Sequence, residues 1–351
     1  MKSYLKRFFI EGLGGMTMGL FATLIIGTII RQIGVYIPGL VGDVFHMVGS
    51  MAISITGAGI GVGVAMRLKA SPLVTVSAAV AGMVGAFAFR LIGGQVIQDV
   101  GMVFAGPGEP LGAFLAAYIA VEIGMLVSGK TKVDIIVTPF VSILCGSSVG
   151  LLIGPPISSF MTMIGGVINW STEQNPLIMG IVVSVIMGMV LTAPISSAAL
   201  AIILDLSGLA AGAATIGCIC NMIGFAVASY RENKTGGLIA QGLGTSMLQM
   251  PNIMKKPIIW LPVILSSAIL GPIATVVFGM TNNATGAGMG TAGLIGPLMT
   301  WQTMTAYQSG GVVILKILLL HLILPAILTL IFSEFMRKRN WIKEGDMKLD
   351  L

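Results

Sequence analysis

Apolar runs of about 20 residues, the length that a helix needs to cross a bilayer, follow one another along most of this chain. Short polar or basic stretches separate these runs. The pattern predicts an all-α polytopic membrane protein with about ten transmembrane helices. The predicted spans cover residues 12–30, 45–66, 72–89, 111–127, 133–152, 176–191, 194–210, 211–229, 257–279 and 312–335.

Three other stretches depart from this pattern. Apolar residues between 154 and 175 recur on one helical face, which predicts an amphipathic helix at the membrane interface. Residues 237–250 begin and end near basic residues, so we expect them to enter the bilayer and return on the same side. Residues 281–300 are polar and rich in glycine, and they predict a second re-entrant segment.

A small-residue hexapeptide occurs twice, as TGAGIG at Thr56–Gly61 and as TGAGMG at Thr285–Gly290. In lipid, backbone that leaves the helix is tolerated only where protein buries it or where it lines a watery cavity. Interrupted segments at corresponding places in two halves of a chain are typical of a transporter binding site. The repeat therefore points to transport.

Composition and charge placement support a membrane protein. Hydrophobic residues make up 56% of the chain and charged residues 9%, far fewer charges than a soluble domain carries. The net charge of +6 does not indicate nucleic-acid binding, because most of the lysines and arginines cluster in short loops between spans. Under the positive-inside rule these loops, and both termini, face the cytoplasm. We therefore expect the chain to lie in a lipid bilayer.

Polar side chains inside the apolar pattern are the candidates for substrate binding, because each is costly in lipid. The first group lies in the second hexapeptide and just before it. Amides and hydroxyls both donate and accept hydrogen bonds, which suits a sugar or polyol. The alternative is an external loop with turn-forming residues. The candidates here are Asn282, Asn283, Thr285, Gly286 and Gly288.

Two further groups of polar residues interrupt apolar runs. Ser196 and Ser197 follow a proline, and such serines either bind a ligand or satisfy carbonyls that the proline leaves free. Gln241, Thr245 and Gln249 share a helix face on the predicted re-entrant segment 237–250. We expect their side chains either to line a cavity or to belong to an amphipathic helix that lies at the cytoplasmic surface.

Ionisable residues inside the predicted spans are Glu122, Asp205 and His321. Glu122 is expected to be neutral by burial or paired with a neighbour, and Asp205 to reach water. A structural histidine at position 321 is favoured over a proton carrier. The three cysteines lack the spacing of a zinc or redox site, so we expect no metal and no cofactor. We also expect no catalytic residues, because no span pairs a nucleophile with a base.

The chain resembles the membrane-embedded IIC component of the bacterial phosphotransferase system, in the branch that includes perfringolysin-regulator-like membrane proteins. The resemblance rests on the number of spans, the interfacial helix after the fifth span and the polar breaks at residues 192–194 and 285–288. It implies a bacterial cytoplasmic membrane location and a sugar held near the midplane by two re-entrant hairpins. Separate IIA and IIB proteins would supply the phosphoryl group, so the chain is not an enzyme by itself.

The expected organisation has three parts. Residues 1–153 form an N-terminal transmembrane scaffold, which we expect to form a homodimer contact. Residues 154–336 form a C-terminal transmembrane half that carries the binding segments and moves by an elevator or rocking motion, and residues 337–351 form a cytoplasmic tail.

One departure from the resemblance leaves two functions open. Better-known carriers of this fold contain a Gly-Ile-Thr-Glu string, but residues 284–288 read ATGAG and contain no acid. The chain is therefore a sugar-class permease, or alternatively a membrane sensor that keeps the fold without phosphorylation-coupled transport.

Overall fold

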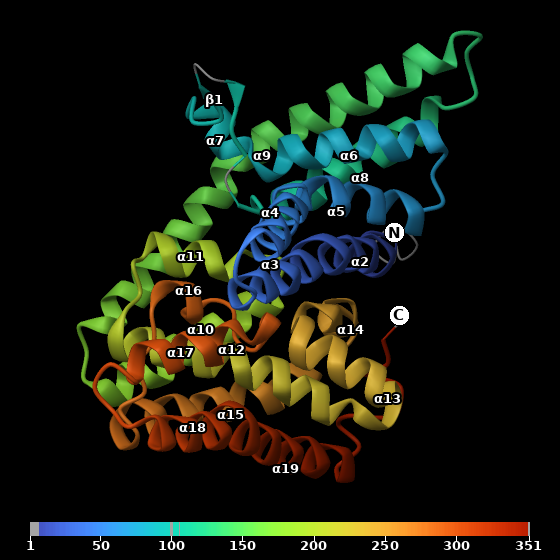
Figure 1. Ribbon diagram of the computed structural model, residues 1–351. Coiled ribbons are helices and arrows are strands. Elements are labelled where there is room, and N and C mark those ends of the chain that lie inside the picture. The colour runs from blue at the N-terminus through green and yellow to red at the C-terminus, as the bar shows by residue number, and fades with distance from the viewer. Residues whose placement is uncertain (1–6, 99–100, 105, 350–351) are drawn as a thin grey trace. The chain divides into compact units, whose positions relative to one another are not determined.

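The computed structural model describes residues 7–98, 101–104 and 106–349. The chain divides into two compact units, Met1–Met161 and Thr162–Leu351. Figure 1 shows that helices make up nearly all of both units. The predicted boundary at residues 153/154 and the observed boundary at 161/162 both lie within one helix, α9 (Asp134–Thr172).

The N-terminal unit begins with a continuous helical run and ends in the first part of α9. A two-stranded antiparallel ribbon, which the sequence pattern did not predict, pairs Ile97 with Met102. The elements before α9 are η1 (Arg7–Gly12), α2 (Leu13–Leu20), η2 (Phe21–Ile25), α3 (Ile26–Tyr36), α4 (Leu40–Ser54), α5 (Thr56–Arg67), α6 (Pro72–Ala86), α7 (Ala88–Ile92), β1 (Ile97–Gln98), β2 (Gly101–Met102) and α8 (Pro110–Val127).

The first hexapeptide is helical, and the break lies just before it. Helices α4 and α5 meet at an angle of 56°. Within α5, a Cβ atom at Gly61 would lie 2.2 Å from the carbonyl oxygen of Ala78 in α6, and a Cβ at Gly63 would lie 2.2 Å from the carbonyl oxygen of Gly15 in α2. The glycines of α5 therefore let two neighbouring helices approach its backbone, as small residues do in membrane bundles.

Helix α9 joins two elements that the sequence analysis separates. Its 39 residues include all but the first residue of the predicted span 133–152 and most of the predicted interfacial helix 154–175. Pro155 and Pro156 do not end the helix. A proline removes one donor and crowds one turn, which bends a helix without stopping it when neighbouring groups satisfy the freed carbonyls.

The C-terminal unit is arranged around α12 (Gly208–Ala228), which packs mainly against the helices α10, α15 and α19. Within the apolar stretch of α12, 89% of the residues are buried. The other elements of this unit are α10 (Pro176–Thr192), α11 (Ser197–Ile203), α13 (Tyr230–Ile239), η3 (Ala240–Gly244), η4 (Ser246–Gln249), α14 (Met250–Lys255), η5 (Pro257–Trp260), α15 (Leu261–Pro272), η6 (Ile273–Val277), α16 (Ala284–Ala287), η7 (Ala292–Leu294), α17 (Ile295–Met304), α18 (Gly310–Leu318), η8 (Leu319–Ile323) and α19 (Leu324–Lys338).

The length and apolar character of the helices show a polytopic membrane protein. Among the described residues, six helices are long and apolar enough to cross a bilayer, or seven if α4 and α5 form one bent span. The apolar helices α6 and α10 are shorter than the other candidates. The predicted span 194–210 is not one helix: it contains the seven-residue helix α11 and the first three residues of α12. Asp205, with a φ of 47°, follows the end of α11, and Gly208, with a φ of 56°, begins α12.

Candidate functional site

The second hexapeptide is held in place by Asn282, whose side chain is almost fully buried. Its amide nitrogen Nδ2 lies 2.8 Å from Thr215 Oγ1 on α12, 2.9 Å from Thr300 Oγ1 and 3.2 Å from the carbonyl oxygen of Gly296, both on α17. These contacts use the donor capacity of the amide. Asn282 therefore fixes the start of this stretch between two helices.

The next residues form one short helical turn, α16. Asn283 caps the turn, because its Oδ1 accepts a hydrogen bond from the backbone nitrogen of Gly286 at 3.0 Å. The side chain of Thr285 is exposed on this turn. Gly290 has a φ of 53°, a conformation that glycine adopts without steric cost, and the chain turns there.

The serine pair and the second hexapeptide converge. Ser197 Oγ donates a 2.7 Å hydrogen bond to the carbonyl oxygen of Gly288, across 91 residues of sequence. A Cβ atom at Gly288 would lie 2.4 Å from the carbonyl oxygen of Ser197, so the two backbones touch. Ser196 accepts a 3.2 Å hydrogen bond from the nitrogen of Ala199 and caps α11.

The predicted re-entrant segment 237–250 is a broken helix. The π-helical turn η3 ends at Gly244, the backbone is extended at Thr245, and the 3-10 turn η4 follows. The Thr245 side chain accepts a hydrogen bond from the nitrogen of Met247 at 3.2 Å. Thr291 Oγ1, just past the second hexapeptide, donates to the carbonyl oxygen of Gly242. The three predicted polar stretches are thus linked through Gly288 and Thr291.

Gln241 belongs to a different set of contacts from the serines. Its Nε2 lies 2.9 Å from Ser229 Oγ and 2.9 Å from the carbonyl oxygen of Gly237, and its Oε1 accepts a 2.8 Å hydrogen bond from Gln249. All three glutamine and serine side chains in this set are buried. They form the base of the broken segment, whereas Thr245 lies at its turn.

A buried network next to these segments joins Thr192, which lies in a predicted polar break, to Asn221, which the sequence analysis missed. Asn221 Oδ1 accepts hydrogen bonds from Thr192 Oγ1 at 3.0 Å and from Trp260 Nε1 at 3.1 Å. The Thr192 and Ser246 hydroxyls lie 2.7 Å apart, which links α10 to the turn of the broken segment. An asparagine inside the 21-residue apolar helix α12 is the sequence signal that could have identified this network.

The three ionisable candidates have different surroundings. Glu122 is paired with Arg7 at 2.5 Å in the N-terminal unit. Asp205 is exposed at the end of α11. His321 is 3% exposed in the π-helical turn η8, and within the described part of the chain its Nδ1 has no hydrogen-bond partner.

The chemistry available where the stretches meet is that of amides, hydroxyls and backbone carbonyls. Among the residues that the structure describes, no group of three His, Cys, Asp or Glu side chains could hold a metal ion. Cys218 Sγ lies 3.5 Å from the carbonyl oxygen of Met187 and is fully buried. The groups present suit hydrogen bonding to an uncharged polar molecule.

Comparison with known proteins identifies the family. No curated protein matches this sequence. The family model for the EIIC component of the phosphotransferase system matches residues 10–349, which is nearly the whole chain. This protein therefore belongs to the phosphotransferase-system EIIC family and is a membrane permease component of that sugar-uptake system.

Proposed function

We propose that the chain binds a neutral sugar or polyol where the serine pair, the second hexapeptide and the turn of the broken segment meet. The hydrogen bond from Ser197 to the carbonyl of Gly288 carries this proposal, because it joins two interrupted segments that are distant in sequence. Interrupted helices at a repeat interface are where membrane transporters place their substrates.

The polar groups at this junction favour an uncharged ligand. Residues 282–288 contain two asparagines, one threonine and no carboxylate or basic group. Asn282 holds the backbone, while Asn283 and the exposed Thr285 offer their remaining donors and acceptors to the substrate. A sugar hydroxyl both donates and accepts, so it can match amide and hydroxyl partners without a charge to desolvate.

In the proposed cycle the substrate lies near the bilayer midplane and becomes accessible from each side in turn. Separate cytoplasmic IIB and IIA proteins deliver the phosphoryl group, and two copies of the chain form a dimer. The alternative function is a membrane sensor, and the missing acid in residues 284–288 favours it. A sensor binds the same ligand but supports no phosphoenolpyruvate-dependent uptake.

Ligand binding by a glycine variant tests the site. Gly288→Val places a side chain against the backbone of Ser197 and Ala198, whereas a Cβ at Gly311 in α18 meets nothing within 4 Å. Purified wild type, Gly288→Val and Gly311→Val are titrated with hexoses, pentoses and disaccharides. We expect Gly288→Val alone to lose affinity by about tenfold or more. Equal affinity in both variants would remove the main support for this site.

Transport separates the two functions. Vesicles that contain the protein, with cytosolic phosphotransferase proteins and phosphoenolpyruvate supplied, are tested for uptake of the sugar that binds. Phosphorylated sugar inside the vesicles is the result expected for a permease. Binding without uptake would assign the sensor function.

A further inference from the structure

A segment that the proposed function does not use folds back onto the C-terminal unit. This tail segment, Asn340–Leu349, follows α19 and buries three apolar side chains, those of Ile342, Met347 and Leu349. Ile342 is 2% exposed and Met347 is 0% exposed, and both pack in a cluster with Phe225 of α12 and Ile253 of α14. Burial of apolar surface on this scale stabilises the docked position.

Three side-chain amides bind the backbone of the tail segment. Asn233 Nδ2 and Gln249 Nε2 each lie 2.9 Å from the carbonyl oxygen of Met347. Asn252 Nδ2 lies 2.9 Å from the carbonyl oxygen of Lys348. The backbone nitrogen of Leu349 in turn donates to Asn233 Oδ1 at 2.8 Å. Residues 344–347 of the tail form turns, so the amides bind the main chain of a turn and of the two residues that follow it.

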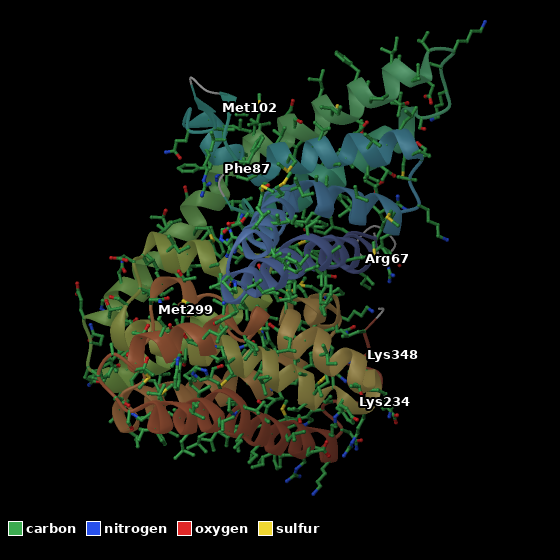
Figure 2. All side chains as sticks on the ribbon, in the orientation of Figure 1. Arg67, Phe87, Met102, Lys234, Met299 and Lys348 are labelled. Atoms are coloured by element: carbon green, nitrogen blue, oxygen red, sulfur yellow. The ribbon has the colours of Figure 1, made fainter. Side chains whose placement is uncertain are left out.

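Two ion pairs flank the amides. Lys256 Nζ lies 2.5 Å from Asp346 Oδ2. Glu232 accepts hydrogen bonds from Arg337 at 3.2 Å and from the backbone nitrogen of Gly345 at 3.0 Å, with 2% of its side chain exposed. Figure 2 shows Lys348 of the tail beside Lys234, which follows Asn233 in α13.

The same amides extend into residues 240–252, which comprise the broken segment from η3 onward and the first residues of α14. Gln249, which binds the tail, donates to Gln241 Oε1 at 2.8 Å, and Asn252 donates to Gln249 Oε1 at 2.9 Å. Gln241 lies in the π-helical turn η3, and Ser246 at the far end of the turn joins Thr192. One continuous chain of contacts thus leads from the tail to the segment proposed to meet the substrate.

We propose that Asn233, Gln249 and Asn252 form a peptide-binding site whose ligand is the chain's own tail segment, and that its occupancy controls the mobility of the segment 240–252. The docked tail holds Gln249 and Asn252 in place and keeps the broken segment closed. Release of the tail frees both side chains and opens the segment. The consequence for substrate exchange rests on the proposed function, but the control of mobility does not.

Amide hydrogen exchange of residues 240–252 measures this control directly. Gln249→Ala removes one tail contact, whereas Gln302→Ala removes an exposed glutamine on α17 and serves as the matched control. We expect exchange in 240–252 to rise by about tenfold in Gln249→Ala only. Gln249→Ala also removes the contact with Gln241, so a second variant is needed. A chain that ends at Arg339 lacks the tail but keeps Gln249, and its residues 240–252 must show the same rise in exchange.

A synthetic peptide of residues 340–351 completes the test. Added to the chain that ends at Arg339, it should bind saturably and restore slow exchange, while a scrambled peptide should do neither. If that shortened chain does not fold, the charge exchange Lys256→Asp with Asp346→Lys replaces it. Each single variant should speed exchange and the double variant should slow it again. Unchanged exchange in the shortened chain or in both single variants would overturn the proposal.

Substrate affinity is measured on the same samples. A change in exchange without any ligand binding would leave the peptide site standing and contradict the sugar-binding function instead.

Discussion

Individual polar residues in the C-terminal unit divide into those that hold backbone and those with capacity left for a ligand. The amide nitrogen of Asn282 donates to Thr215, Thr300 and Gly296. The hydroxyl of Ser197 donates to the carbonyl oxygen of Gly288. The side-chain oxygen of Asn283 caps a helix, and its amide nitrogen lies 3.6 Å from the sulfur of Met299. A thioether is a weak acceptor, so that nitrogen is the donor most easily turned towards a sugar hydroxyl.

Asn283→Ala is therefore predicted to affect both stability and binding. Asn175 caps α10 in the same way, with its Oδ1 3.0 Å from the nitrogen of Ile178, and Asn175→Ala is the matched control. Each variant should lose about 0.5 to 2 kcal/mol of stability through the lost cap. Only Asn283→Ala should weaken sugar binding, by about tenfold. Equal affinities in the two variants would assign Asn283 a capping role alone.

Asp346 gives a prediction for pH. Burial raises the pKa of this carboxyl, but the hydrogen bond from Lys256, the backbone nitrogen of Lys343 and the charges of Lys256 and Arg337 outweigh burial and hold the pKa below its ordinary value of 3.8. A lowered carboxyl pKa stabilises the folded state above the ordinary pKa, and this contribution is lost as the pH falls through the folded value.

The exchange-rate difference between wild type and Asp346→Asn in residues 240–252 should therefore be constant above about pH 5 and shrink below about pH 4. The rates are corrected for the intrinsic pH dependence of exchange. A difference that shrinks near neutral pH would show that another group controls docking of the tail.

At the scale of single elements, two nearly identical hexapeptides serve different purposes. Thr56–Gly61 continues as helix α5, and its glycines contact the backbones of neighbouring helices. Thr285–Gly290 forms one turn of helix and then leaves it, with Gly290 at a positive φ. The neighbours of each string explain the difference, because α2 and α6 pack along the first, while Asn282 and Ser197 hold the ends of the second.

Gly61→Ala should destabilise the N-terminal unit by about 1 to 3 kcal/mol, because the added methyl overpacks a helix contact. The new atom would lie 2.2 Å from the backbone oxygen of Ala78. At Gly14, also inside a helix, the nearest atom lies 3.7 Å away, so Gly14→Ala should be neutral or slightly stabilising. Thermal unfolding in detergent compares the two, and a similar unfolding temperature would argue against tight packing of α5 on α6.

At the scale of the whole molecule, the family assignment and the long apolar helices agree on a membrane permease component. The positions of the basic loops predict the orientation of the chain in the membrane, with these loops on the cytoplasmic side. Cysteines at Lys69, Lys132 and Lys255 should react with a membrane-impermeant reagent only from the cytoplasmic side. The wild type, with Cys145, Cys218 and Cys220, gives the background. Labelling of any of the three new positions from outside intact cells would overturn the predicted orientation.

The sequence by itself determined the class of the molecule. Long apolar runs have no stable place except a bilayer or a large core, and a bilayer accepts them only as helices, so composition and periodicity were sufficient for a polytopic helical protein. The same reasoning identified the polar breaks at Ser196, Ser197 and 282–288, because polar groups in an apolar run are costly and hence informative.

Tertiary structure decided how those pieces combine. The contact between Ser197 and Gly288, the network around Asn221 and the binding of the tail by Gln249 all join residues that are distant along the chain. The structure also shows that α9 continues through Pro155 and Pro156 and that α11 has only seven residues. Local propensity says which groups need a hydrogen-bond partner, but only the packed fold determines which partner each group finds.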